Sequence, residues 1–210
     1  MISRPRFVLF SLVGLLAGCS VLSPKPDFSR FYVLNPLTVK AAPLPPPDPT
    51  LSLIVFSAEV PDYLDRPQIV TRLPGNQIGL DEYRRWAEPL GSALARVLAQ
   101  DIAFYADSPH VAAFPVPPGF GQEFEINVQV LQFDGAPGGD VTLHAQWRIS
   151  GPGGKPNYYT HDSVYTRQAD PGADSAAGYV DALSALAGDL ARDMVAAVSE
   201  ARTAKAAVTP

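Results

Sequence analysis

The sequence contains a single cysteine and three histidines, and this scarcity excludes several kinds of site. One thiol cannot form an internal disulfide and is too few for a structural zinc site, so a packed hydrophobic core must hold the fold. His110, His144 and His161 form neither an HxH nor an HExxH spacing that would point to a metal. We therefore predict that the protein has no metal site and no cofactor.

Sequence signatures of catalysis are also missing. No G-x-S-x-G nucleophile elbow is present, and the similar stretch LGSAL at Leu90–Leu94 lacks the second glycine and falls in a predicted helix. The glycine clusters lie between β-rich runs, where hairpin turns need them, and form no phosphate-binding loop. The Asp62–Asp65 and Asp134–Asp140 pairs are interpreted as turn residues. We predict that the protein is not an enzyme; a hydrolase with catalytic residues far apart in sequence is kept as an alternative.

Basic residues are too few and too scattered for a nucleic-acid-binding surface. The chain has 16 Lys and Arg against 21 Asp and Glu, without a Lys/Arg cluster. Because phosphate backbones are bound by basic patches, we expect no nucleic-acid partner. The same deficit argues against electrostatic binding to a membrane surface.

The one long apolar run lies at the N-terminus and is too short to span a bilayer. Phe7–Leu16 has ten residues, of which only Ser11 and Gly14 are not apolar. A membrane-spanning helix needs about 20 apolar residues. Arg4 and Arg6 precede the run, and small residues follow it. This arrangement is typical of a signal peptide.

The residues that end this run, Leu16–Cys19, resemble the bacterial lipobox. In lipoproteins of that type the cysteine thiol is alkylated by diacylglycerol, the chain is cut before the cysteine, and the new amino group is acylated. The resemblance predicts a lipoprotein signal peptide at 1–18, lipidation at Cys19 and a lipid-anchored tether at 19–29, since several acyl chains together hold stably. Ser20 stands where Asp would favour retention in the inner membrane. The expected location is therefore the outer membrane of a Gram-negative bacterium, facing the periplasm.

Residues 30–205 are predicted to form a single periplasmic α+β domain. Apolar and polar residues alternate in Phe124–Val130 and in Val141–Ile149, as in strands with one buried face. Tyr158–Arg167 completes a three-stranded β-meander, and the change of parity at Leu131 predicts a bulge. The polar row of these strands is expected to face solvent. It comprises Glu125, Gln129, His144, Gln146 and Arg148.

Two segments show helical periodicity. One runs to about Tyr105 with Pro89 expected at the first helical position, and the other starts at Ser175 and is expected to fray beyond Arg202. Earlier strands are predicted at 31–34, 51–60, 68–73 and 77–80. The resulting fold is an α+β layer, a largely antiparallel sheet that includes the meander and is covered on one face by the two long helices.

Two motifs in the first half carry a family resemblance. VPDYLDRPQIVTR at Val60–Arg72 is followed by YRRWAEPL at Tyr83–Leu90. In this order, with the lipobox, the early FYVL strand and the C-terminal amphipathic helix, they resemble the PqiC-like family of auxiliary lipoproteins of ABC-type and MCE-type transport systems. The likeness spans nearly the whole mature chain, although the proline-rich connector at Ala41–Pro49 departs from it.

The resemblance implies a non-catalytic outer-membrane accessory subunit of an intermembrane lipid transport system that supports envelope integrity. Its partners would be an MCE-domain protein that spans the periplasm and the inner-membrane permease complex. A homo-oligomer fits such a conduit because a ring needs repeated subunits, but the residues fix no number of copies. The alternatives are a structural or assembly lipoprotein of a secretion or pilus machine, and a lipid-anchored hydrolase.

We hypothesise that the two motifs form one contact edge for the bridging protein or a sister subunit. The candidate partner-binding residues are Tyr63, Leu64, Asp65, Arg66, Arg85, Trp86 and Glu88. The competing interpretation is structural. Trp86 would then pack the helix start onto the sheet, and the arginines would form ordinary surface ion pairs, Arg66 with Asp65 and Arg85 with Glu88, worth about 0–1 kcal/mol each.

Overall fold

The computed structural model of the chain describes residues 27–40, 46–172 and 175–208. Cys19, the predicted signal peptide and residues 20–26 lie outside the described residues. Within the described part, no helix is both long enough and apolar enough to cross a membrane. In chain order the elements are β1 (Arg30–Tyr32), β2 (Leu53–Glu59), β3 (Gln68–Leu73), β4 (Gln77–Trp86), α2 (Leu90–Ala106), β5 (Val111–Ala113), β6 (Phe124–Gly135), β7 (Asp140–Ser150), the 3-10 helix η2 (Pro152–Gly154), β8 (Asn157–Gln168) and α3 (Ser175–Val208).

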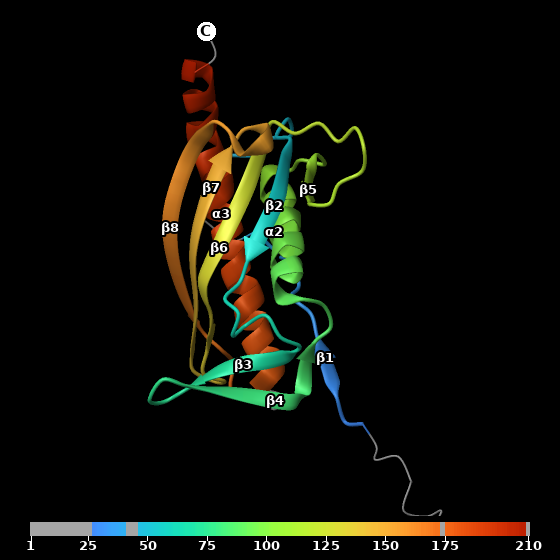
Figure 1. Ribbon diagram of the computed structural model, residues 1–210, viewed down its shortest axis with the longest axis vertical. Helices are drawn as coiled ribbons and strands as arrows, with labels where there is room; N and C mark the ends of the chain where they lie inside the picture. The colour runs from blue at the N-terminus through green and yellow to red at the C-terminus, as the bar shows by residue number, and fades with distance from the viewer. Residues whose placement is uncertain (1–26, 41–45, 173–174, 209–210) are drawn as a thin grey trace, which may run out of the picture.

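The strands form two sheets. The larger has five strands in the order β5-β2-β6-β7-β8, and the smaller has three in the order β1-β4-β3. The meander β6-β7-β8 and the β3-β4 hairpin are antiparallel, whereas β2 runs parallel to both β5 and β6. Both long helices lie on one face of the larger sheet, and the smaller sheet lies at one end of the molecule (Figure 1). The predicted α+β fold with its C-terminal meander is confirmed, and the second sheet and the parallel pairs are additions to it.

The predicted bulge lies on β6, where the register with β7 shifts between Val130 and Gln132. Before the shift Phe124 and Val130 face the core, and after it Phe133 does so with 1% of its surface exposed. The extra residue, Leu131, is exposed. The bulge thus keeps an apolar side chain on the core face while the strand changes parity.

One end of each long helix differs from the sequence prediction. Pro89 has an extended backbone with ψ 131° and precedes the helix, so Leu90 is the first helical residue. α3 continues past Arg202 to Val208. Arg202 and Lys205 each bind the carboxylate of Glu123 at 3.0 Å, and Arg202 also pairs with Asp48 at 2.7 Å. These ion pairs hold the last turns that were expected to fray.

Asp101 on α2 is a fully buried carboxylate that binds the segment after β1. Its Oδ1 accepts a hydrogen bond from the backbone N–H of Leu37 at 2.7 Å, and its Oδ2 has no partner among the described residues. Burial raises the pKa of Asp101 to about 6, and the single hydrogen bond from Leu37 only partly opposes this. At neutral pH the folded protein therefore contains a buried, poorly solvated carboxylate at Asp101.

The Asp101→Asn variant should be more stable than the parent at pH 7.5 and equally stable at pH 4. The raised pKa means that the folded state holds the proton more tightly than the unfolded state, so Asp101 contributes stability at low pH that is lost as pH rises from about 4 to 6. The difference should be of order 2 kcal/mol at pH 7.5. Urea unfolding of both proteins across this range measures it. A difference independent of pH would contradict the assignment.

Candidate functional site

The two sequence motifs meet in space. The segment Pro61–Pro67 begins with a hydrogen-bonded turn in which the N–H groups of Leu64 and Asp65 donate to the carbonyl of Pro61 at 2.8 and 3.2 Å. Its last residue is held by the second motif, because the N–H of Trp86 donates to the carbonyl of Pro67 at 2.7 Å. The two segments, about 20 residues apart in sequence, therefore form one continuous surface.

This surface encloses a hollow of about 280 Å³, which we call the motif cleft. Four of the seven predicted partner-binding residues line it, and the indole of Trp86, 7% exposed, forms part of its apolar wall. The full lining is Asp65, Arg66, Pro67, Trp86, Ala87, Glu88 and Pro89.

The charged residues of the two motifs are paired differently from the pairs expected from the sequence. Glu88 pairs with Arg96 of α2 at 2.5 Å, and Arg85 pairs with Glu82 at 3.6 Å, so the expected Arg85–Glu88 pair is wrong. Arg66 makes no ion pair with a described residue, and its Nε atom is buried without a hydrogen-bond partner. A buried donor left unsatisfied costs about 1–3 kcal/mol. Because Arg66 lines the motif cleft without an ion pair to a described residue, its positive charge is suited to a carboxylate supplied by a partner.

The other predicted residues lie elsewhere. Leu64 is 2% exposed and belongs to the core, and Arg85 is on β4 opposite the exposed Phe31 of β1. Tyr63 points away from the motif cleft toward the larger sheet, where its hydroxyl donates to Oδ2 of Asp134 at 2.6 Å. Leu64 and Tyr63 thus have structural contacts within the domain, and four of the seven candidate partner-binding residues share the motif cleft.

Asp134 is the centre of a buried hydrogen-bond cluster. Its carboxylate is fully buried and also accepts from Nε of Arg72 at 2.6 Å and from Nε2 of Gln132 at 2.9 Å. Burial and the bond to Asp134 raise the pKa of Tyr63 to about 12, so this hydroxyl remains a donor. The interpretation of Asp134 as a turn residue is wrong, because the bulge on β6 directs its side chain under the β3-β4 sheet. The only sequence signal for the buried position of Asp134 is the change in the apolar–polar alternation at Leu131.

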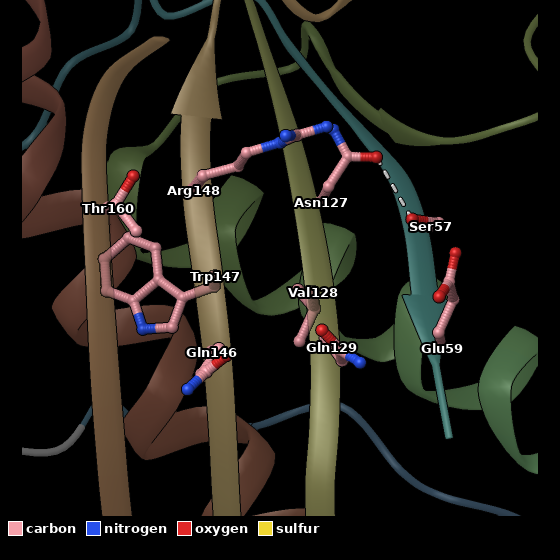
Figure 2. Close-up of a pocket in the computed structure, with 9 residues that line it drawn as sticks. All are labelled: Ser57, Glu59, Asn127, Val128, Gln129, Gln146, Trp147, Arg148 and Thr160. Atoms are coloured by element: carbon pink, nitrogen blue, oxygen red, sulfur yellow. Dashed lines mark hydrogen bonds between the residues drawn. The ribbon is translucent and has the colours of Figure 1, made fainter. Parts of the chain in front are cut away.

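A second hollow, of about 270 Å³, lies on the helix-free face of the larger sheet (Figure 2). Its polar lining includes Asn127, whose side-chain oxygen accepts from the Ser57 hydroxyl at 3.1 Å. Arg148, the register partner of Asn127, has no hydrogen bond or ion pair to a described residue. The complete lining is Ser57, Glu59, Asn127, Val128, Gln129, Gln146, Trp147, Arg148 and Thr160.

The predicted polar row follows this face with one exception. Gln129, Gln146 and Arg148 are exposed, whereas Glu125 is 6% exposed. Its carboxylate accepts at 2.9 Å from the N–H groups of both Gly153 and Gly154. Glu125 therefore fixes the turn between β7 and β8 and does not present a charge to solvent.

The described residues show no assembly typical of catalysis. No group of three or more His, Asp or Glu side chains among them is placed to hold a metal ion. The nearest approach to an acid–base pair is His144 with Asp162, at 2.6 Å on the exposed sheet face. No serine hydroxyl of the described part hydrogen-bonds to His144, so the pair lacks a nucleophile to activate.

The chain resembles several known proteins. A family model described as "ABC-type transport auxiliary lipoprotein component" matches residues 32–195. The chain is similar to a solved protein of Xanthomonas campestris from family DUF330, at 14% sequence identity and a TM-score of 0.66 over 83% of this chain and 99% of the other. A solved uncharacterized protein is similar at 20% identity and a TM-score of 0.60, over 81% and 98% of the two chains. No curated protein matches. At these identities the structural likeness shows the fold.

Replacement of Asp134 by Ala should lower the free energy of unfolding by about 2–4 kcal/mol, because Arg72 and the Tyr63 hydroxyl lose their shared acceptor. Urea unfolding measures the loss. Asp140→Ala is the matched control, since Asp140 is exposed at the first position of β7 and should change stability by less than about 0.5 kcal/mol. Equal losses in the two variants would show that the cluster adds nothing to stability.

Proposed function

The chain belongs to the family of ABC-type transport auxiliary lipoprotein components, and on that premise we propose that it is a non-catalytic accessory subunit of an ABC/MCE-type system that moves lipids between the two membranes. It is anchored in the outer membrane through acyl chains on Cys19 and faces the periplasm. Its partners are the MCE-domain protein that bridges the periplasm and, through it, the inner-membrane permease complex. Several copies form the outer-membrane end of the conduit.

The observation that carries this proposal is the motif cleft. The two stretches on which the family resemblance rests come together there, and they enclose an apolar hollow beside an arginine that has no ion pair with a described residue. Such a site can accept a carboxylate that lies next to an apolar side chain of a partner protein, a combination typical of interface hot spots. The described residues that line it include no nucleophile paired with a base.

The anchoring half of the proposal predicts two changes of location. Cys19→Ala should move the protein from the detergent phase to the aqueous phase in detergent phase partitioning, because the thiol that carries the lipid is gone. Ser20→Asp should leave the protein lipidated but shift it to the inner-membrane fraction of a sucrose gradient. An unchanged distribution of both variants would contradict the assignment of Cys19 as the anchor.

The docking half predicts that Arg66→Glu weakens the contact with the MCE-domain protein. Cross-linking of the mature protein in intact envelopes, followed by mass spectrometry of the linked partners, should show a roughly tenfold lower yield with the variant, since the reversed charge would repel a partner carboxylate.

Arg84→Glu is the matched control. Arg84 is a similarly exposed arginine on β4 that lies outside the motif cleft and pairs with Asp81 at 3.4 Å. The partner should remain cross-linked to this variant. Equal yields from the parent and Arg66→Glu would refute the role of the motif cleft, and cross-links to secretion or pilus proteins alone would refute the proposed function.

A further inference from the structure

Exposed apolar side chains gather on the smaller sheet. Twelve large apolar side chains of the described residues are exposed, and six of them lie on this sheet or just before it. These six are Phe28, Phe31, Leu73, Ile78, Leu80 and Tyr83. The smaller sheet lies at the end of the molecule opposite the C-terminal end of α3 (Figure 1). A concentration of exposed apolar side chains at one end is typical of a contact with a partner or a membrane.

Three of the six, Phe28, Phe31 and Tyr83, form what we call the aromatic patch. They are 69%, 63% and 58% exposed. β1 pairs with β4 from Arg30 opposite Arg84 onward. Tyr83 lies one position before this first pair, and Phe28 lies two positions before β1. The three rings therefore come from neighbouring positions of two adjacent segments of the chain.

The charged side chains beside the aromatic patch are paired with one another. Arg84 lies 3.4 Å from Asp81, and Arg85 lies 3.6 Å from Glu82. These pairs leave no net charge on this part of β4, so an anionic or a zwitterionic lipid surface would not repel it. Aromatic rings among polar groups are typical of side chains that lie at a membrane–water interface.

The predicted lipid anchor is close to the same end of the domain. Asp27 lies three residues before β1, and Cys19 is eight residues before Asp27 in the sequence. Eight residues span at most about 28 Å even when fully extended. Acyl chains on Cys19 would therefore hold the smaller sheet within that distance of the bilayer. A surface kept so close to lipid meets it at a high effective concentration.

We propose that the aromatic patch is a membrane contact, in which the rings of Phe28, Phe31 and Tyr83 enter the headgroup region of the leaflet that holds the acyl chains. The contact needs little affinity of its own, because the anchor supplies the proximity. The domain then stands on its smaller sheet. The motif cleft is thereby presented close to the lipid surface, since its residue Trp86 pairs with Tyr32 of β1. The inference rests on the anchor in the proposed function and adds a phospholipid surface as a ligand of the folded domain.

Quenching of tryptophan fluorescence can test the contact. The mature lipidated protein is reconstituted in liposomes of phosphatidylethanolamine and phosphatidylglycerol, with or without a phosphatidylcholine that carries a nitroxide near its headgroup. Phe31→Trp and Tyr83→Trp each add an indole to the aromatic patch, and the emission of the parent is subtracted. We expect the nitroxide lipid to quench the added emission by about half or more, because an interfacial indole lies beside the quencher.

Val164→Trp is the matched control for exposure. Val164 is 61% exposed on β8 of the larger sheet, and we expect its added indole to be quenched by less than about a tenth. In the Phe31→Trp protein, Phe28→Ser with Tyr83→Ser should reduce the quenching roughly threefold, because a single ring binds lipid weakly. Phe56→Ser with Phe114→Ser removes two exposed rings elsewhere and should leave the quenching unchanged. Flotation of each variant with the liposomes reports whether the anchor is intact.

The inference is overturned if the indoles added at positions 31 and 83 are not quenched while the protein floats with the liposomes, and the proposed function then stands. Equal quenching of Val164→Trp would also overturn it, since the domain would then lie on its side. So would shielding of the indoles that appears only as protein density rises, since a second copy would be the occupant. Failure of the parent to float would refute both the anchor and the contact. Quenching as expected, with cross-links only to other envelope machines, would leave the contact standing and refute the proposed function.

Discussion

The carboxylate of Asp134 is the constraint on which the arrangement of the two sheets depends. A fully buried charge is tolerated only when several donors reach it, and here they come from three places: the Tyr63 turn, the Arg72 strand and β6 itself. The hydroxyl of Tyr179 on α3 adds a further tie, because it donates to the carbonyl of Val70 and accepts from the N–H of Gly135. The smaller sheet is thereby fixed against both the larger sheet and a helix.

The position of the motif cleft depends on the hydrogen bonds to Asp134. Pro67 and Trp86 are joined by a backbone hydrogen bond, but the turn that ends at Pro67 is oriented by Tyr63, whose hydroxyl reaches Asp134. A further hollow beside the start of α2 connects the motif cleft with the hollow drawn in Figure 2, because it shares Asp65 with the first and Ser57 and Glu59 with the second. The three hollows therefore form one continuous strip of surface.

Local patterns predicted the elements well and their tertiary relations poorly. The alternation of apolar and polar residues over Phe124–Val130 indicated a strand with one buried face, and the change in this alternation at Leu131 indicated the bulge. Both signals depend only on neighbouring residues. The parallel pairing of β2 with β5 and β6 depends on contacts across α2, which no local pattern contains. The motif residues were recognised as a group, yet the sequence could not separate Tyr63, which serves the buried cluster, from Arg66, which faces the motif cleft. The roles of Tyr63 and Arg66 differ because their side chains point in different directions from the same turn.

The segment that follows β1 has a mechanical consequence. Its backbone is bound to both helices, by Asp101 at Leu37, by Arg96 at the carbonyl of Leu34, and by the Ser184 hydroxyl at Asn35. A pull on the N-terminal end of the domain would first load the three residues of β1 and then these bonds. Tension would thus be resisted by bonds spread over two helices before it reached the five-stranded sheet. The motif cleft would be loaded earlier, because its residues Trp86 and Ala87 are joined to Tyr32 of β1.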